Sequence, residues 1–358
     1  MTPGASPALV LDLEKRSPEV RSLVETLNKR IVGQPEAVKV LADIVETYQS
    51  GLCDPFRPAG SALFMGVTGS GKTATVEAAC EALFGNPRAC VKVDASLYQH
   101  SHEIAKLIGS PAGYLGHRET PALLNQKRLQ EFHTDKLKLG VVLIDEVEKA
   151  SDSLWQLLLG ILDKAELTLG DTSLVNFSQT IIVMTSNLGA KDISKLVLGK
   201  GLGYRAESAI PIDKAKIDDI AVNAARKHFS PEFLNRIDYT VVFNSLTEAD
   251  VRQIMEIELG LVQRLMWDVG KFLYQVTNVA KNKLMEEGFS KEYGAREMKR
   301  SIEKRVRLPL ARLIASGQIT PGDIVIVDDK GGPHFEFTLT KLRDTQVTFT
   351  DFTKEILE

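Results

Sequence analysis

One segment of eight residues, Gly66 to Thr73, constrains the fold of this 358-residue chain more than any other feature. It reads Gly-Val-Thr-Gly-Ser-Gly-Lys-Thr and fits the pattern G-x-x-x-x-G-K-[ST]. An apolar run, Ala62 to Met65, directly precedes it, and a helical pattern of apolar residues directly follows it. Glycines let consecutive backbone N–H groups turn inward and surround phosphate oxygens at a helix N-terminus. The order of strand, loop and helix therefore predicts a nucleotide-binding α/β domain.

Each residue type in this loop has a chemical task. The backbone of Gly69, Ser70 and Gly71 is expected to hold phosphate oxygens. Lys72 is expected to reach the β and γ phosphates of ATP, and Thr73 to ligate Mg²⁺. The alternative is a glycine-rich turn that fits the pattern by chance. With glycine at about 7% of residues, the bare pattern arises in about one chain of this length in a hundred, and the flanking strand and helix reduce that frequency further.

Short apolar runs alternate with amphipathic helical patterns, and this alternation is typical of a parallel sheet with helices on both faces. The runs are Ala62–Met65, Val91–Val93, Val141–Ile144 and Ile181–Met184. A first helix is expected after Ser17, which can cap it. A later, mostly helical region is expected to start at Thr247 and Asp250. It closes with two predicted strands, Ile324–Val327 and Phe335–Leu339.

These patterns divide the chain into four predicted parts. They are a flexible lead-in over residues 1–16, a large α/β domain over 17–245, a small helical domain with terminal strands over 246–345, and a tail over 346–358. The lead-in is rich in Pro, Gly, Ala and Ser, a composition that buries too little apolar surface to order itself.

Two adjacent carboxylates, Asp145 and Glu146, follow one of the apolar runs. Ligands of open α/β sheets bind at the carboxyl ends of the strands. Asp145 is therefore expected to hold the Mg²⁺ shell, and Glu146 to orient and deprotonate the attacking water. Glu148 is left unassigned, because a solvated acidic turn accounts for it equally well. Asn187, after the next run, can donate to a γ-phosphate and hold the water, or it can be ordinary turn chemistry.

Composition excludes several classes of protein. Lys plus Arg number 44 and Asp plus Glu 47, so the formal net charge of −3 provides no overall attraction to polyanions. Cys53, Cys80 and Cys90 are odd in number and lack C-x-x-C spacing, which indicates reduced packing thiols. The six histidines show no spacing typical of a metal site. No apolar run reaches the roughly 18 residues of a membrane span, so we expect a soluble, cytoplasmic protein.

Many motifs, in their order and spacing, resemble the Clp branch of the AAA+ ATPases, specifically the second nucleotide-binding module of the ClpA, ClpB and ClpC unfoldases. The resemblance runs from about Leu23 to Asp328. Besides the phosphate loop, the matching stretches are Lys29–Gln34, Val93–Ser96, Gly113–Gly116, Leu143–Ala150, Met184–Gly189, Pro231–Asp238 and Tyr293–Arg296.

This resemblance implies further roles. Ile31 and Val32 are implied to line the adenine pocket, and Asn187 to sense the γ-phosphate. Arg236 is implied to be the arginine finger that each subunit inserts into its neighbour's site, and Arg296 the second sensor, carried on the small domain. A planar, permanently charged guanidinium suits both tasks. From the residues alone, either arginine could equally form an ordinary salt bridge.

Two loops carry the remaining resemblance. Tyr114, between Gly113 and Gly116, is similar to the aromatic pore-loop residue that grips a translocating polypeptide. The alternative is a turn tyrosine packed on its own domain. Residues 202–204, Leu-Gly-Tyr, are similar to the tripeptide with which some Clp proteins dock on a ClpP-like peptidase, and they could also form a plain connector.

The resemblance implies an ATP-dependent protein unfoldase or remodelling ATPase that acts as a ring, expected to be a hexamer, and threads protein substrates through a central pore. Because a single module is present, the ring is expected to have one tier. ATP and Mg²⁺ are the implied cofactors, and an adaptor or peptidase is a potential partner. Two alternatives stay open: a dedicated assembly ATPase of a larger machine, and a nucleic-acid remodelling motor. The net charge and the loop around Tyr114 argue against the second.

Overall fold

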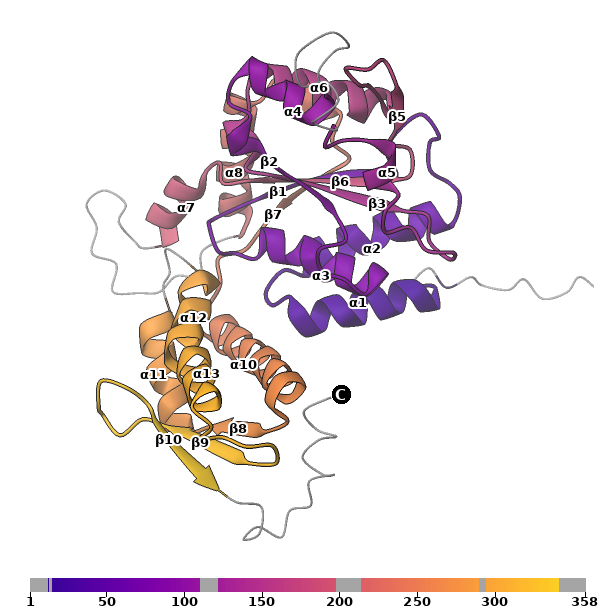
Figure 1. Cartoon of the computed structure of the whole chain (residues 1–358). Helices are drawn as coiled ribbons and strands as arrows, with labels where there is room; N and C mark the ends of the chain where they lie inside the picture. Colours follow the sequence, from indigo (N-terminus) through magenta and orange to yellow (C-terminus); the bar gives the residue numbers. More distant parts are fainter. Residues whose placement is uncertain (1–11, 13–14, 110–121, 198–213, 290–293, 341–358) are drawn as a thin grey trace, which may run out of the picture.

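The computed structural model describes residues 12, 15–109, 122–197, 214–289 and 294–340, which form a larger α/β part and a smaller C-terminal part (Figure 1). Most of the predicted lead-in and all of the predicted tail lie outside these residues. No helix in the described ranges is long and apolar enough to cross a membrane.

A five-stranded, all-parallel sheet lies at the centre of the larger part, with strand order β2-β3-β6-β1-β7. Its strands are β1 (Gly60–Met65), β2 (Val91–Asp94), β3 (Gly140–Asp145), β6 (Thr180–Ser186) and β7 (Tyr239–Val242). The four predicted apolar runs form β1, β2, β3 and β6, so the expected fold class is confirmed. The edge strand β7 was not predicted, because only Val241 and Val242 in it are buried and no long apolar run marks it.

Alternate side chains of the sheet enter two separate cores, as the period of two in a strand requires. Ala62 and Phe64 of β1 belong to one core, and Leu63 and Met65 belong to the other. Helices α1 (Pro18–Arg30), α2 (Pro35–Gln49) and α3 (Lys72–Phe84) cover the first face (Figure 1). The second face is covered by α6 (Asp152–Lys164), α8 (Lys214–His228) and α9 (Pro231–Asn235).

Short elements complete the larger part. They are η1 (Ala95–Leu97), η2 (Ser101–Ile104), α4 (Ala105–Ile108), α5 (Gln126–Leu129), η3 (Val147–Lys149), the antiparallel pair β4 (Glu166–Thr168) and β5 (Leu174–Asn176), and α7 (Ala190–Val197).

Both predicted helix starts are confirmed by their hydrogen bonds. The Ser17 hydroxyl accepts from the backbone N–H of Val20 at 3.2 Å, which caps α1. Thr247 and Asp250 form a reciprocal capping box at the start of α10 (Glu248–Gly270).

The smaller part has its own core, formed by α10, α11 (Asn278–Gly288), α12 (Ala295–Ile302), the π-helical turn η4 (Glu303–Arg307) and α13 (Leu308–Ala315). The two predicted terminal strands are present as β9 (Ile324–Asp328) and β10 (Glu336–Thr340), paired antiparallel. A third strand, β8 (Leu273–Val276), pairs parallel to β9 and was not predicted. The buried Gln263 amide fixes its start, because it accepts from Tyr274 N at 2.8 Å and donates to Phe272 O at 3.2 Å.

Candidate functional site

The glycine-rich loop joins β1 to α3, as predicted, and two of its glycines are required by the geometry. A Cβ on Gly66 would lie 2.9 Å from the Phe243 carbonyl oxygen, so the close approach of β1 to that segment excludes a side chain. Gly71 has φ of 104° and precedes the first residue of α3, and no described side chain caps this helix. The N–H groups of the first turn of α3 are therefore available to an anion, which a helix N-terminus favours.

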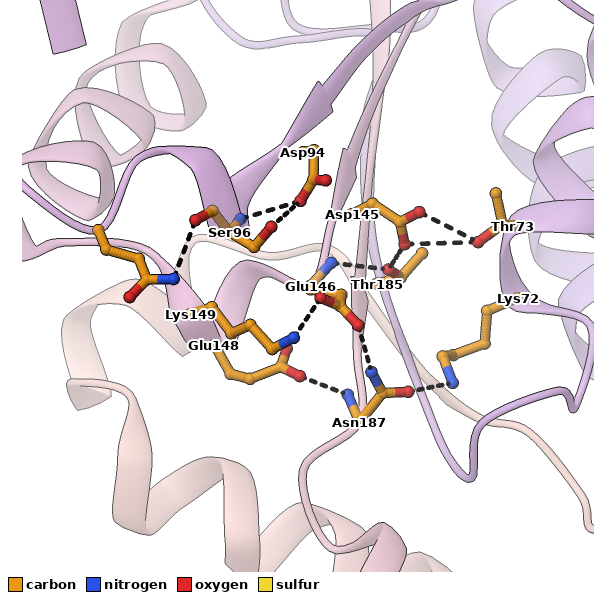
Figure 2. A network of polar contacts seen from close by, with 11 residues as sticks. Lys72, Thr73, Asp94, Ser96, Asp145, Glu146, Glu148, Lys149, Thr185 and Asn187 are labelled. Atoms are coloured by element: carbon orange, nitrogen blue, oxygen red, sulfur yellow. Dashed lines mark hydrogen bonds and ion pairs between the residues drawn. The ribbon is translucent and has the colours of Figure 1, made fainter. Parts of the chain in front are cut away.

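The Lys72 side chain lies inside this loop and is 8% exposed. Its ammonium donates to the carbonyl oxygens of Gly66 (2.8 Å) and Val67 (3.0 Å). It also donates to Asn187 Oδ1 at 3.0 Å, as Figure 2 shows. Burial lowers the pKa of Lys72 to about 8, and the carboxylates of Glu148 and Asp145 partly offset that effect. Lys72 is thus a buried cation held in position before any phosphate binds.

Asp145 and Thr73 face each other across the loop, as a shared metal site requires. The Thr73 hydroxyl lies 3.4 Å from both carboxylate oxygens of Asp145, and the Thr185 hydroxyl donates to Asp145 Oδ1 (Figure 2). Lys92 from β2 lies 3.4 Å from Asp145 Oδ2. A hydroxyl and a carboxylate are hard oxygen donors, which Mg²⁺ prefers, so the donor set fits that ion.

Glu146 adopts a left-handed backbone conformation, with φ of 56° and ψ of 46°, directly after β3. Such a conformation costs of order 1 kcal/mol for a residue other than glycine and persists only where the surroundings hold it. The Glu146 N–H donates to the Thr185 hydroxyl at 3.1 Å, and Asn187 Nδ2 donates to Glu146 Oε1 at 3.3 Å. The strained turn brings the carboxylate to the same side of the strand ends as Lys72.

A cavity of about 250 Å³ lies between these strand ends, the loop and α12. Its lining includes predicted residues from both parts of the chain: Gly69, Gly71, Lys72, Thr73, Asp145, Glu146, Asn187 and Arg296. Lys299, one turn after Arg296 on α12, also lines it and was not predicted. The structure therefore brings together eight predicted residues whose sequence positions span more than two hundred residues.

The two parts touch where α12 begins. The Ala295 N–H donates to the Gly69 carbonyl at 3.2 Å, and a Cβ on Gly294 would lie 2.6 Å from that same oxygen. Gly294 also has φ of 56°, a conformation that glycine adopts without strain. This contact carries Arg296 to the rim of the cavity.

Three of the residues predicted to bind the nucleotide do not line this cavity. Val32 is buried at 8% exposure and Ile31 packs against the core beneath α1. Ser70 is also buried, and its carbonyl accepts from Gln34 Nε2 at 3.2 Å. Gln34 was not singled out in the sequence. Its side-chain amide also donates to the Asn244 carbonyl at 3.0 Å and accepts from the Asn244 N–H at 2.9 Å. It thereby ties the segment before α2 to the phosphate loop and to the segment after β7.

Arg236 lies away from this cavity, at the C-terminal end of α9. Its guanidinium is 42% exposed and pairs with Asp163 Oδ1 at 2.6 Å. Arg57 donates to the Arg236 carbonyl at 2.8 Å and pairs with Asp238 at 3.0 Å, so the backbone of this residue is held by the loop before β1.

Several predicted features lie outside the described residues: Tyr114 with its flanking glycines, the tripeptide at 202–204, and Tyr293. The described residues contain no cluster of three or more histidine, cysteine, aspartate or glutamate side chains that could hold a metal ion. Cys53, Cys80 and Cys90 are free thiols.

Besides Lys299, two polar residues at the site were missed. Thr185 bridges Asp145 and the Glu146 N–H, and a threonine inside the buried strand β6 was the available signal. Glu148 is not a solvated acid, because Oε1 accepts from Asn187 N at 3.1 Å and Oε2 is closed off from solvent. The sequence alone could not show that Glu148 turns inward in addition to Asp145 and Glu146.

Family models match both parts of the chain. One, described as an AAA domain of the Cdc48 subfamily, matches residues 57–240. Another, described as the C-terminal D2-small domain of ClpB protein, matches residues 246–327.

Curated proteins of known name are similar over most of the chain. It is 36% identical to the chaperone protein ClpB of Bacteroides thetaiotaomicron over 319 residues, which make up 89% of this chain and 36% of that protein. It is 37% identical to the ATP-dependent Clp protease ATP-binding subunit ClpA homolog of Cyanidium caldarium over 316 residues, 88% of this chain and 36% of that one. The chain thus spans about a third of the length of these relatives.

Solved structures of Hsp104 share the fold. A closed-state reconstruction of Hsp104 with ATPγS and FITC-casein gives a TM-score of 0.73 at 30% identity, covering 89% of this chain and 52% of that one. The S. cerevisiae Hsp104–casein complex in its extended conformation gives 0.73 at 31% identity, covering 88% and 51%.

The lowered pKa of Lys72 predicts that nucleotide affinity depends on pH. Bound phosphate favours the ammonium form, which the free protein loses as pH rises through about 8. Affinity for ADP is therefore expected to fall above pH 8, approaching tenfold per pH unit, with uptake of a proton on binding. Calorimetric titrations at pH 7, 8 and 9, in buffers of different ionisation enthalpy, measure both effects. The variant Lys72→Arg, whose guanidinium stays charged, should show no such fall in ADP affinity between pH 7 and 9. A wild-type affinity that is constant over the same range would contradict the prediction.

The contact between Gly294 and Gly69 predicts that the smaller part contributes to nucleotide binding. Gly294→Ala places a Cβ against the Gly69 carbonyl and is expected to raise the Kd for a fluorescent ADP analogue by about tenfold or more. Gly317→Ala is the matched control, because Gly317 also has positive φ (70°) but no described atom within 4 Å of an added Cβ. Equal affinities in the two variants would show that the contact is dispensable.

Proposed function

The chain belongs to the Clp family of AAA+ ATPases, which are ATP-hydrolysing enzymes, and on this basis we propose that it uses ATP hydrolysis to unfold or remodel other proteins. One observation carries the proposal. Residues from the phosphate loop, from the ends of β3 and β6 and from α12 converge on one cavity between the two parts of the chain. Closure of the smaller part on the nucleotide would then be coupled to the state of the phosphates.

The chemistry at this cavity assigns a role to each side chain. Lys72 and the free N–H groups of α3 hold the phosphates, and Thr73 and Asp145 hold Mg²⁺. When bound, Mg²⁺ supplies charge that offsets the build-up of negative charge on the phosphoryl oxygens. Glu146 accepts the proton of the attacking water, and the Asn187 amide beside it orients that water.

Arg236 supports a site shared between subunits. Its guanidinium is well exposed and does not line the cavity of its own chain, while its backbone is held firmly by Arg57. We therefore propose a homo-oligomeric ring, with a hexamer as the expected size, in which Arg236 acts on a neighbour's nucleotide. To do so it exchanges Asp163 for the phosphates, and these are the more strongly charged partner.

Protein chains are the proposed substrate, since the Hsp104 structures with this fold were determined with casein. Tyr114 is proposed to grip the chain in a central pore. The tripeptide at 202–204 is proposed as a docking element for a ClpP-like peptidase. Three free thiols fit a reducing compartment such as the cytoplasm.

Replacing Tyr114 separates an unfoldase from other ATPases that share the same catalytic residues. Tyr114→Ala is expected to keep ATP hydrolysis and lose unfolding of a tagged fluorescent protein, because the grip depends on the aromatic ring. Tyr114→Phe should retain both activities. ATP turnover and loss of reporter fluorescence are measured side by side. Equal unfolding by wild type and Tyr114→Ala would contradict threading, and stimulation of hydrolysis by DNA but not by casein would favour a nucleic-acid motor.

Replacing Arg236 tests whether the site is shared. Arg236→Ala is expected to bind ATP normally and to lower turnover by about 10³-fold or more, the loss typical of an arginine finger. Mixed rings of Arg236→Ala and Lys72→Ala subunits should regain part of the activity, because some boundaries then combine an intact loop with an intact arginine. With assembly verified by light scattering, absence of any recovery would indicate action within one subunit.

A further inference from the structure

Glu148 is an acidic residue of the site for which neither the sequence motifs nor the proposed chemistry provides a role. It lies in η3, the single turn that follows Glu146, and its Oε1 accepts from the backbone N–H of Asn187 at 3.1 Å (Figure 2). Its Oε2 is inaccessible to solvent and has no hydrogen-bond partner among the described residues. Burying a carboxylate oxygen costs free energy, so Glu148 is not simply a solvated surface acid.

The turn that carries Glu148 is held from two sides. Trp155 Nε1 on α6 donates to the Val147 carbonyl at 3.0 Å, and His228 Nε2 at the end of α8 lies 2.9 Å from the Glu148 carbonyl. The Trp155 and His228 rings meet edge to face, with centroids 5.4 Å apart. These contacts leave the η3 backbone little freedom, so the Glu148 carboxylate is a fixed acceptor.

Asn187 depends on such an acceptor for its orientation. Its Oδ1 accepts from Lys72 at 3.0 Å, and its Nδ2 donates to Glu146 Oε1 at 3.3 Å, so one amide bridges the phosphate-binding cation and the catalytic carboxylate. It comes directly after the end of β6, where the ladder no longer holds the backbone. Its backbone N–H instead donates to the Glu148 side chain, at Oε1.

We propose that Glu148 is a positioning residue, which anchors the backbone of Asn187 so that the Asn187 amide stays between Lys72 and Glu146. The inference rests on the proposed hydrolysis of ATP, because the bridge matters only if Glu146 activates water. A charged acceptor makes a stronger bond to a backbone N–H than a neutral one. The Glu148 carboxylate also contributes most, among the neighbouring charges, to keeping Lys72 protonated against its burial.

Steady-state kinetics of three variants test this role. Glu148→Ala removes the acceptor and is expected to lower kcat for ATP by roughly 10- to 100-fold, with the Kd for ADP within about threefold of wild type. Glu148→Gln keeps an acceptor oxygen at the same reach and should recover most of that loss. Glu303→Gln is the control, because Glu303 forms an exposed pair with Arg307 on η4, and its kcat should equal wild type. Wild-type kcat in Glu148→Ala would overturn the proposal.

A double-mutant cycle shows whether Glu148 acts through Asn187. The double variant Glu148→Ala/Asn187→Ala should be no slower than Asn187→Ala alone, to within about twofold. The reason is that Asn187→Ala already removes the side-chain amide that Glu148 positions. Defects that multiply would overturn the proposal, as would normal turnover of Asn187→Ala.

Hydrogen exchange separates this proposal from the proposed hydrolysis. The Asn187 amide proton, followed by NMR, should be protected in wild type and Glu148→Gln and exchange at least about tenfold faster in Glu148→Ala. That result is independent of turnover. Equal exchange rates in all three proteins would overturn the positioning role, whereas an inactive wild type with the expected exchange pattern would contradict only the proposed function.

Discussion

The site depends on a buried ammonium. Lys72 gives up most of its hydration, and its three donors are directed to two loop carbonyls and to Asn187. These bonds fix the shape of the glycine-rich loop from within, so the N–H groups at the start of α3 point outward before nucleotide arrives. The carboxylates of Glu148 and Asp145 offset part of the cost of burial. The Lys72 ammonium, the loop carbonyls and the two carboxylates therefore stabilise one another electrostatically.

A parallel sheet explains why these groups meet. Strands β3 and β6 are adjacent and run in the same direction, so Glu146 and Asn187 lie at the same edge although they are 41 positions apart in sequence. The helix α3 starts at that edge as well. The smaller part completes the site from outside the sheet. The Ala295 N–H donates to the Gly69 carbonyl, and this close approach leaves no room for a side chain at Gly294.

The η3 turn and Arg236 belong to one packed region. Trp155, His228, Phe229 and Phe233 form a continuous series of ring contacts from η3 to α9, and Arg236 follows directly at the end of α9. These ring contacts pack the turn that follows β3 against the helix that ends at Arg236. Asp163 pairs with the Arg236 guanidinium, and Arg57 donates to the Arg236 backbone carbonyl.

Local sequence determined the elements whose signals are local: the phosphate loop, four buried strands, the capped starts of α1 and α10, and the acids at the end of β3. It also singled out Lys72, Thr73, Asp145, Glu146 and Asn187 from the chemistry that each residue type can perform, and all five line one cavity. It missed β7 and β8, because a short strand is recognised by the neighbour that pairs with it and not by its own apolar content. Only tertiary structure decided that Glu148 turns inward, that Thr185 bridges two acids and that Arg236 lies apart from its own chain's cavity. Those outcomes depend on burial and on partners distant in sequence, and a local pattern carries no information about either.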